Sequence, residues 1–558
     1  MAVLLVGLLG AVNFMARLDQ PAGMLWDEGY YLTSTQHYED ERAQFATHPP
    51  LGMMLLAAGD ALLQPNARRD TSHLGDSKHA ADTALPPGYS LLGMRLASGL
   101  ATILSALVMF ALTLTLSRSL PVALVSANLF VFDNALVAHL RAAHLDAFQL
   151  LFVLLALWAW ISAVMQESTW MCSALRSEES SSHTSCEARK LLLPSASHSV
   201  SVSDSGLRRN DERGASGAFH GYSLGRKRGL RPPTANARGL GIQPHRAGWR
   251  EAAIGGAGAL ALLVKLDAAW LLMPAAMLVL LRGWQHRATG SWRSVLVASS
   301  AATRMLAAGA LVTAAVLIAH VVLGRKLPDA ATAAGRQDSP FVTGAYRQYL
   351  LHEMPLSPRV LLDAAADYAQ FMAADLHGLG RHDANGSTPW QWLYQQQPIN
   401  YRWDSDGVHT SYVQLVANPI GWALASLAPL AAAWLLWLQW YWPIRGRWTP
   451  RTFLLGALLS AWLACFLLHQ WISAQRVMYL YHAFNGLLLA FLLAALAWSM
   501  ATERWPALHR RQTIVLTTFA ALHLAAFLWL SPLSFHRPLT HTACERRNVP
   551  WHIVACQP

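Results

Sequence analysis

Long apolar segments recur along the chain and are separated by polar stretches. Many contain about 18–25 residues, enough for a helix to cross the roughly 30 Å hydrocarbon core of a bilayer. This pattern predicts an all-α polytopic membrane protein with about eleven transmembrane helices. The predicted spans lie near residues 2–18, 91–116, 120–140, 145–165, 251–265, 267–283, 299–323, 411–440, 452–470, 479–500 and 512–530. The first run has no basic start and no clear cleavage site, so we expect a retained helix rather than a signal peptide.

Basic residues are concentrated in alternate loops. The Lys/Arg-rich segments are the turn at Arg118 and the stretches 166–250, 282–293, 445–451 and 504–511. Because such loops stay in the cytoplasm, the pattern predicts a cytoplasmic N-terminus. Two large loops, 19–90 and 324–410, and the tail 531–558 are then outer segments. The spacing in 357–378 predicts a helix that lies along the membrane surface.

The chain also divides by composition. Residues 1–165 form an N-terminal transmembrane module with the first outer loop, and 251–323 and 411–530 contain the remaining helices. Residues 166–250 are Ser-rich and basic and lack hydrophobic periodicity, which predicts a disordered cytoplasmic insert. Its basic run could bind anionic lipid headgroups or act as a solvated linker.

Composition narrows the class of protein further. The 558 residues are 54% hydrophobic and 13% charged, a combination that soluble domains rarely have. The net charge of +11 belongs to the basic loops and indicates no nucleic-acid partner. The cysteines and histidines have no metal-binding spacing, so we predict no metal and no cofactor, leaving a divalent cation open. Cys544 and Cys556 could pair if the tail faces an oxidising compartment.

The first outer loop begins with two adjacent acids, Asp27 and Glu28, followed by Tyr30 and Tyr31. A carboxylate at the membrane surface is suited to hold an acceptor hydroxyl and take its proton. The alternative is a solvated pair of acids at a helix end. Both interpretations are open at this point.

Further polar residues fall at the outer ends of predicted helices. The segment 133–146 contains Arg141, whose guanidinium matches phosphate oxygens but could instead pair with Asp133 or Asp146. Lys265 could bind an anion or pair with Asp267. Together with Arg476, these cations could form a phosphate-binding site at the membrane surface.

Four stretches in order carry a family resemblance. They are WDEGYY with HPPLGMMLLA, MRLASGL with FDNALVAHLRAAHLDAFQLLF, GSTPWQWLYQQQPINY, and QRVMYLYHAF. With them the chain resembles the protein O-mannosyltransferase family, polyprenyl-phosphate-sugar-dependent glycosyltransferases with the GT-C fold. The loop 324–410 is too short for the β-trefoil domain of eukaryotic members, which favours a prokaryotic type.

The resemblance implies an inverting transfer of a sugar, mannose being expected, from a polyprenyl phosphate to Ser/Thr hydroxyls of exported proteins. Asp27 would be the general base, and Glu28 would orient it or the acceptor. Arg141 is the first expected ligand of the donor phosphate, followed by Arg476 and Lys265. The remaining pocket residues are expected to be His48, Asp133, Asn134, Asp146, Trp390, Trp392, Tyr481 and His482.

The chain departs from the family pattern at three places. Met53 stands where members often have Lys, Leu266 follows Lys265 where a Trp is common, and the Pro common after the last Tyr-His is absent near Asn485. These departures leave the sugar and acceptor open.

Besides a non-catalytic partner of an active homologue, against which the intact pair of Asp27 and Glu28 argues, two other functions share this pattern. One is sugar transfer to a glycolipid such as lipid A by the same fold. The other is a lipid transporter or flippase, which would place charges deep within spans rather than at helix ends. The expected partners are the lipid-linked donor, an exported protein and membrane lipids. The expected location is a prokaryotic inner membrane with the site outside, or the endoplasmic reticulum with a lumenal site.

Overall fold

The computed structural model describes residues 1–178, 248–285, 291–378, 380, 382–441, 449–548 and 553–557. The predicted insert at 166–250 lies largely outside these residues, although helix α7 extends into it as far as Glu178. The transmembrane region of the first half contains α1 (Ala2–Met15), α4 (Leu92–Ser117), α5 (Leu120–Val131), α6 (Asn134–Leu140), α7 (Asp146–Glu178), α8 (Gly248–Val264), η4 (Leu266–Leu271), α9 (Leu272–Gln285) and α10 (Ser291–Leu323). That of the second half contains α15 (Pro419–Tyr441), α16 (Pro450–Ser473), η8 (Leu480–Ala483), α17 (Phe484–Arg504) and α18 (Pro506–Ser534).

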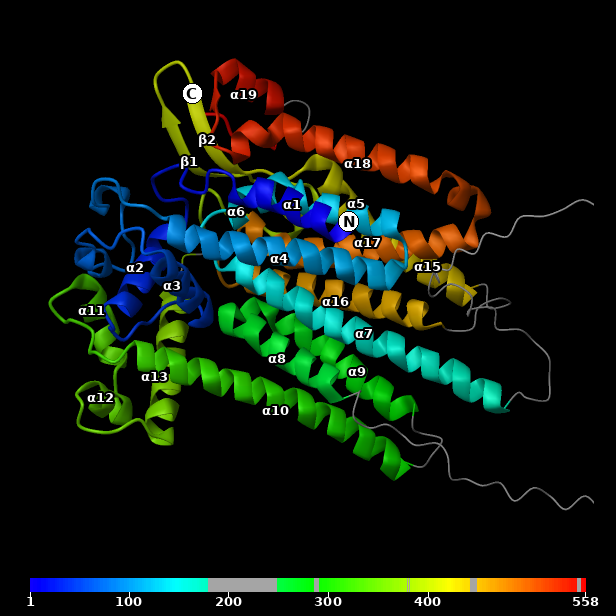
Figure 1. Cartoon of the computed structure of the whole chain (residues 1–558), viewed down its shortest axis with the longest axis horizontal. Helices are drawn as coiled ribbons and strands as arrows, with labels where there is room; N and C mark the ends of the chain where they lie inside the picture. Colours follow the sequence, from blue (N-terminus) through cyan, green and yellow to red (C-terminus); the bar gives the residue numbers. More distant parts are fainter. Residues whose placement is uncertain are drawn as a thin grey trace, which may run out of the picture. The chain divides into compact units, whose positions relative to one another are not determined.

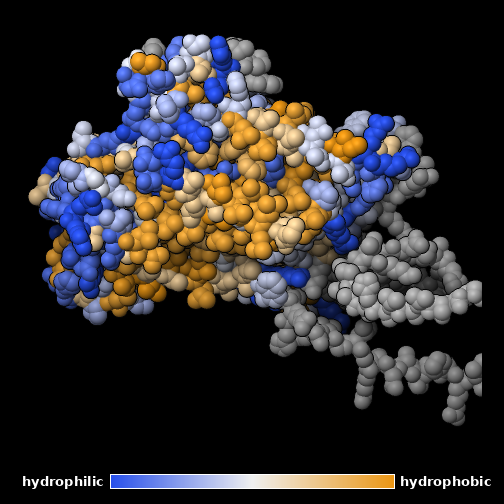
Figure 2. Space-filling view, turned by 45° about the horizontal axis from the view of Figure 1, so that its top comes forward, coloured by the Kyte–Doolittle hydropathy of each residue, from blue (hydrophilic) through white to orange (hydrophobic). Residues whose placement is uncertain are grey.

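The long helices lie side by side, with α17 among them as a central element (Figure 1). Leu488, Leu492 and Leu496 on α17 are completely buried, and so are Leu154 and Leu157 on α7. An apolar surface covers the middle of the face seen in Figure 2 and is flanked by hydrophilic atoms. This is the distribution expected of a bundle that spans a bilayer.

The structure leaves the predicted count of about eleven spans unconfirmed. Within the described residues, eight helices are long and apolar enough to cross a membrane, or nine if α5 and α6 form one span. The sequence count of about eleven also included α1 and α8, which have only 14 and 17 residues. The predicted span 120–140 is bent by 56° between α5 and α6. Asp133 caps α6 at this bend by accepting a hydrogen bond from the Leu136 amide.

The two large loops fold together at one end of the bundle (Figure 1). The backbones of Ala43 and Lys326 are hydrogen-bonded across the loops, and Lys78 forms an ion pair with Asp338. The first loop contains α2 (Glu28–Glu39), α3 (Leu51–Leu63), η1 (Ser72–Gly75) and η2 (Asp82–Ala84). The second contains α11 (Ala333–Asp338), η6 (Ser339–Phe341), α12 (Gly344–Leu350), α13 (Pro358–Gly378) and α14 (Pro389–Leu393). The helix predicted in 357–378 is therefore present as α13.

A small antiparallel sheet was not predicted. It contains β1 (Ile399–Ser405), β2 (Thr410–Leu415) and the short β3 (Pro538–Leu539), in the order β1-β2-β3. The predicted span 411–440 is therefore wrong at its start, because 411–415 belong to β2 and the helix begins at Pro419.

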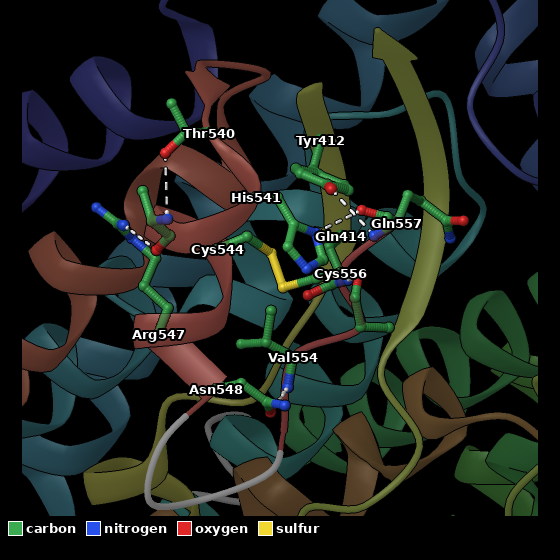
Figure 3. The surroundings of a disulfide bond; sticks show 12 residues. Tyr412, Gln414, Thr540, His541, Cys544, Arg547, Asn548, Val554, Cys556 and Gln557 are labelled. Carbon is green, nitrogen blue, oxygen red and sulfur yellow. Dashed lines mark hydrogen bonds between the residues drawn. A yellow bond between two sulfur atoms is a disulfide. The ribbon is translucent and has the colours of Figure 1, made fainter. Parts of the chain in front are cut away.

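The C-terminal tail packs against this sheet. It contains α19 (His541–Asn548), and a disulfide joins Cys544 to Cys556 (Figure 3). Cys544 lies in an apolar cluster with Tyr412 of β2 and Leu533 of α18. The pairing left open by the sequence is thus formed in the structure.

Candidate active site

A cavity of about 280 Å³ opens where the two large loops meet the ends of the spans. One wall is a face of α2, on which Asp27, Tyr30, Ser34 and His37 follow one another at helical spacing. The second half of the chain supplies the opposite wall, with Arg476, Tyr479, Tyr481 and His482 among its residues. The cavity therefore brings the first and fourth sequence motifs together.

Asp27 lies at the N-terminus of α2 and faces the cavity. Its Oδ2 accepts a long hydrogen bond, 3.4 Å, from the hydroxyl of Tyr481. Burial raises the pKa of Asp27 above its ordinary value, against the opposing charges of His144 and Lys265. A carboxylate with a raised pKa is a stronger base, and this one lines the cavity.

Glu28, the neighbouring acid, does not line the cavity. Its side chain is completely buried and accepts two hydrogen bonds from Arg95, at 2.8 and 2.7 Å, and one from each of the Ala143 and Leu25 amides. Burial alone would raise the pKa of Glu28, but the charge and hydrogen bonds of Arg95 outweigh it and lower the pKa. Glu28 therefore connects α2 to α4 and to the turn before α7. These bonds hold the start of α2, and with it the neighbouring Asp27, in place.

Of the three predicted cations, one lines the cavity and a second lies behind its wall. Arg476 lines it, and no ion pair holds Arg476 within the part of the chain that the structure describes. Lys265 lies behind the wall, with its Nζ 5.3 Å from the centre of the Tyr481 ring. Burial, followed by the charges of Lys265 and Arg476, lowers the pKa of His48 to about 3, so this cavity residue is neutral.

Lys265 pairs with Asp146 rather than with Asp267. Its Nζ lies 2.9 and 2.8 Å from the two carboxylate oxygens of Asp146, which also accepts from His139 Nε2 at 2.9 Å. Asp267 contacts Gln149 and His469 instead. The pair of Lys265 and Asp146 joins α7 to the end of α8 directly behind Tyr481.

Arg141, the first phosphate ligand expected from the sequence, does not line the cavity. Its guanidinium donates to the backbone carbonyls of Ala16, Arg17 and Ser534, and it lies over the ring of Phe535. These bonds attach the turn before α7 to the ends of α1 and α18. Neither of the acids considered as partners, Asp133 or Asp146, holds it among the described residues.

The other predicted pocket residues divide into two groups. His48, Tyr481 and His482 line the cavity. Asp133 and Asn134 instead hold helices together, since Asp133 accepts from Trp422 Nε1 and Asn134 donates to the Phe527 carbonyl. Trp392 is buried and donates to Ser387, whereas Trp390 is half exposed and packs against Phe466. The third motif therefore supports the site from outside it.

Met53 occupies the place where the family often has Lys. It is 1% exposed and lines the cavity. The preceding Gly52 allows α3 to approach the turn before α7, because a Cβ there would lie 2.7 Å from Leu145 Cδ2. The His-Pro-Pro-Leu-Gly run thus contributes His48 to the cavity wall, and Met53 directly follows the run.

Arg95 and Tyr401 contact residues of the site but were not singled out in the sequence. Arg95 is an almost fully buried charge in the first turn of an apolar span, a signal the sequence contained because such charges are costly without a partner. Tyr401 comes from the unpredicted hairpin, and its ring stacks on Trp26 at 5.5 Å. No spacing in the sequence connected residue 401 with residue 26.

Comparison with known families shows to which enzyme family this chain belongs. The family described as dolichyl-phosphate-mannose-protein mannosyltransferase matches residues 4–176, and the C-terminal four-transmembrane region of protein O-mannosyltransferase matches residues 366–551. Together the matches cover more than half of the chain and include all the cavity residues except Gln337. The chain belongs to the protein O-mannosyltransferase family. The enzyme class predicted from the motifs is therefore confirmed.

One solved structure supports the fold of this protein O-mannosyltransferase. The S. cerevisiae protein O-mannosyltransferase Pmt1-Pmt2 complex bound to the sugar donor matches with a TM-score of 0.66 and 13% identity, covering 100% of this chain and 93% of that chain. The Archaeoglobus fulgidus oligosaccharyltransferase in complex with Zn and sulfate matches with a TM-score of 0.45 and 10% identity, over 100% and 57% of the two chains. The first match confirms the GT-C type membrane fold.

Proposed function

We propose that this protein O-mannosyltransferase transfers mannose from a polyprenyl-phosphate carrier to Ser or Thr hydroxyls of exported proteins, at the outer face of the membrane. Asp27 takes the proton from the acceptor hydroxyl, whose oxygen attacks the anomeric carbon. The bond between that carbon and the phosphate oxygen breaks, so the configuration inverts. The polyprenyl phosphate leaves as an anion and needs no strong general acid.

The observation that carries this proposal is the placement of Asp27 and Arg476 in one cavity. A base and a cation on the same cavity are what an in-line displacement with a phosphate leaving group requires. Arg476 replaces Arg141 as the first choice for the phosphate, because it reaches the cavity without an ion-pair partner in the described ranges. Lys265 adds positive charge from behind Tyr481.

The disulfide supports an outer location for the cavity. Cys544 and Cys556 lie in the tail that packs on β2, and β1 of the same sheet carries Tyr401 to the residue before Asp27. Disulfides persist in the periplasm, in the endoplasmic reticulum lumen and outside cells. This placement agrees with the cytoplasmic N-terminus expected from the basic loops.

Purified protein in lipid nanodiscs tests the acceptor. It is incubated with polyprenyl-phosphate-mannose and either a Ser/Thr-rich peptide or a lipid A acceptor, beside Asp27→Asn and the exposed control Asp19→Asn. We expect mannosylated peptide from the wild type and from Asp19→Asn only. Mannosylated lipid A with unmodified peptide would overturn the protein-directed function, and full activity of Asp27→Asn would overturn the base.

A further inference from the structure

A β-bulge directs Tyr401 toward the candidate base. Asn400 pairs with Gln414 and Arg402 pairs with Val413, so Tyr401 is the extra residue of β1 between two regular pairs. Bulges of this kind change the direction of a side chain and are common next to active sites. Tyr401 is 7% exposed, although it comes from a hairpin whose tip is open to solvent.

The hydroxyl of Tyr401 lies 2.5 Å from His139 Nδ1. The other ring nitrogen, Nε2, lies 2.9 Å from a carboxylate oxygen of Asp146. Because Asp146 also pairs with Lys265, it is an ionised carboxylate and can only accept a hydrogen bond. In the neutral imidazole Nε2 therefore carries the proton and Nδ1 accepts from Tyr401. Burial raises the pKa of Tyr401 well above its ordinary value, so the phenol keeps the proton that it donates.

From Tyr401, one series of contacts leads to Asp27 through His139. The His139 ring stacks on the ring of Tyr481, with centroids 4.8 Å apart and an angle of 19° between the planes. Tyr481 in turn donates its hydroxyl to Asp27. A displaced His139 would thus displace the hydrogen-bond donor of the base.

A second series of contacts runs through Trp26, the residue before Asp27. Trp26 has a φ of 46°, a left-handed conformation that is costly for a large side chain and persists only where its surroundings impose it. Its indole lies between the ring of Tyr401, stacked at 5.5 Å, and the edge of Tyr479 at 5.6 Å. Tyr401 therefore also supports the backbone turn from which Asp27 projects.

The disulfide-closed tail fixes the hairpin from its other side. Gln414 and Asn400 both donate to the carbonyl of Ala555, at 2.8 and 3.2 Å, next to Cys556. The Gln557 amide donates to the hydroxyl of Tyr412 (Figure 3). Asn400 and Gln414 are the pair directly before the bulge, so the tail holds the bulge where Tyr401 begins.

We propose that Tyr401 is a positioning residue for the base Asp27, and that the tail closed by Cys544–Cys556 holds it in place. This inference rests on the proposed role of Asp27. Tyr401 touches no reacting atom and acts through Trp26 and through His139 and Tyr481. A break at either support changes the orientation of Asp27 while leaving the cations of the cavity in place.

Conservative and disruptive variants at position 401 test this role. Tyr401→Phe keeps the stack on Trp26 and loses the hydrogen bond to His139, so we expect kcat to fall about tenfold and the KM for the lipid donor to stay within twofold. Tyr401→Leu loses both contacts and is expected to lower kcat about 100-fold. The control Tyr394→Phe changes a tyrosine that is 70% exposed and should behave as wild type.

The acid limb of kcat against pH distinguishes positioning from folding. A role in stability alone would lower the yield or Tm but leave kcat per folded enzyme and its acid limb unchanged. We expect the limb to move in Tyr401→Phe, because the surroundings of Asp27 change. A Tyr401→Phe enzyme with wild-type kcat and a wild-type pH profile overturns the proposal.

Hydrogen exchange gives a readout that does not depend on mannosyl transfer. The amides of Met24, Leu25 and Glu28 donate to Asp82, Glu28 and the Leu25 carbonyl, and should be protected in the wild type. We expect faster exchange in the peptide 24–31 of Tyr401→Leu, and unchanged exchange would overturn the positioning role. An inactive wild type that still shows this difference would count against the proposed function alone.

The part played by the disulfide is tested by a double-mutant cycle. Cys544→Ala with Cys556→Ala is expected to lower kcat about threefold in the wild-type background and to have no further effect in Tyr401→Leu. Equal losses in both backgrounds would mean that the disulfide does not act through Tyr401.

Discussion

The Asp27 cavity and the network around Glu28 contain adjacent acids of the chain. The two carboxylates differ in how many hydrogen bonds they accept. Glu28 accepts four hydrogen bonds of 2.7 to 2.8 Å and is completely closed to solvent. Asp27 accepts one side-chain bond of 3.4 Å and faces an open volume next to Arg476. A carboxylate with all its bonds made holds the fold together, whereas one with unused acceptor capacity beside a cavity is available for chemistry.

Removing the charge of Asp27 should give the largest effect on activity. We expect Asp27→Asn to lower kcat by about 10³-fold, within the range seen for general bases, while Tm changes little because few bonds are lost. Steady-state kinetics and thermal unfolding of the same preparation measure both quantities. A loss of folded protein that accounts for the loss of activity would place Asp27 with Glu28 as a structural acid.

The matching change at Glu28 should act on stability instead. Glu28→Gln leaves the buried Arg95 without its countercharge, at a cost of about 3 kcal/mol. Arg95 keeps its bonds to the carbonyls of Leu18, Pro21 and Gly23, so the loss should be at the low end for buried pairs. Thermal unfolding in nanodiscs measures it. An unchanged Tm together with strongly reduced kcat would contradict a structural role.

The two arginines extend the same comparison to cations. Arg476→Ala removes a charge from the cavity, so we expect kcat to fall by about 10²-fold, as for other lost transition-state contacts. Arg141→Ala removes a cation bonded to backbone carbonyls and should lower kcat by less than about tenfold. Kinetics with the lipid-linked donor compare them. The reverse order would restore Arg141 as the phosphate ligand.

On acidification, Asp27 should become protonated at a higher pH than Glu28. The pKa of Asp27 is raised, so the base is protonated, and activity lost, at a higher pH than for an ordinary aspartate. The pKa of Glu28 is lowered; its stabilising effect is complete above its ordinary value of 4.5 and is lost only as pH falls through the lower folded value. Activity should therefore disappear reversibly before Tm falls. Coincident losses would contradict the two opposite shifts.

The sequence correctly predicted those elements that depend only on interactions within their own segment. A run such as 92–117 must form a helix in a bilayer, because its backbone groups find no other partners there. It failed at 411–415, where an apolar stretch before Pro419 continues the pattern of a span but pairs with β1 instead. Strand pairing depends on a partner elsewhere in the chain, and nothing in the segment itself specifies that partner.

The cations illustrate the same limit within the site. Arg141, Lys265 and Arg476 all lie at or next to helix ends. Which of them faces the cavity depends on neighbours distant in sequence. The carbonyls of Ala16 and Ser534 hold Arg141, and Asp146 holds Lys265.

The sequence by itself determined the membrane class, most of the spans, the pair of acids and the family to which its motifs belong. Only the tertiary structure decided that Asp27 opens to the cavity while Glu28 is closed by Arg95, and that Tyr401 stacks on Trp26, the residue before Asp27. The reason is physical. Hydrophobicity is a property of each segment, whereas the role of a charged side chain depends on which partners satisfy it, and distant parts of the chain supply those partners.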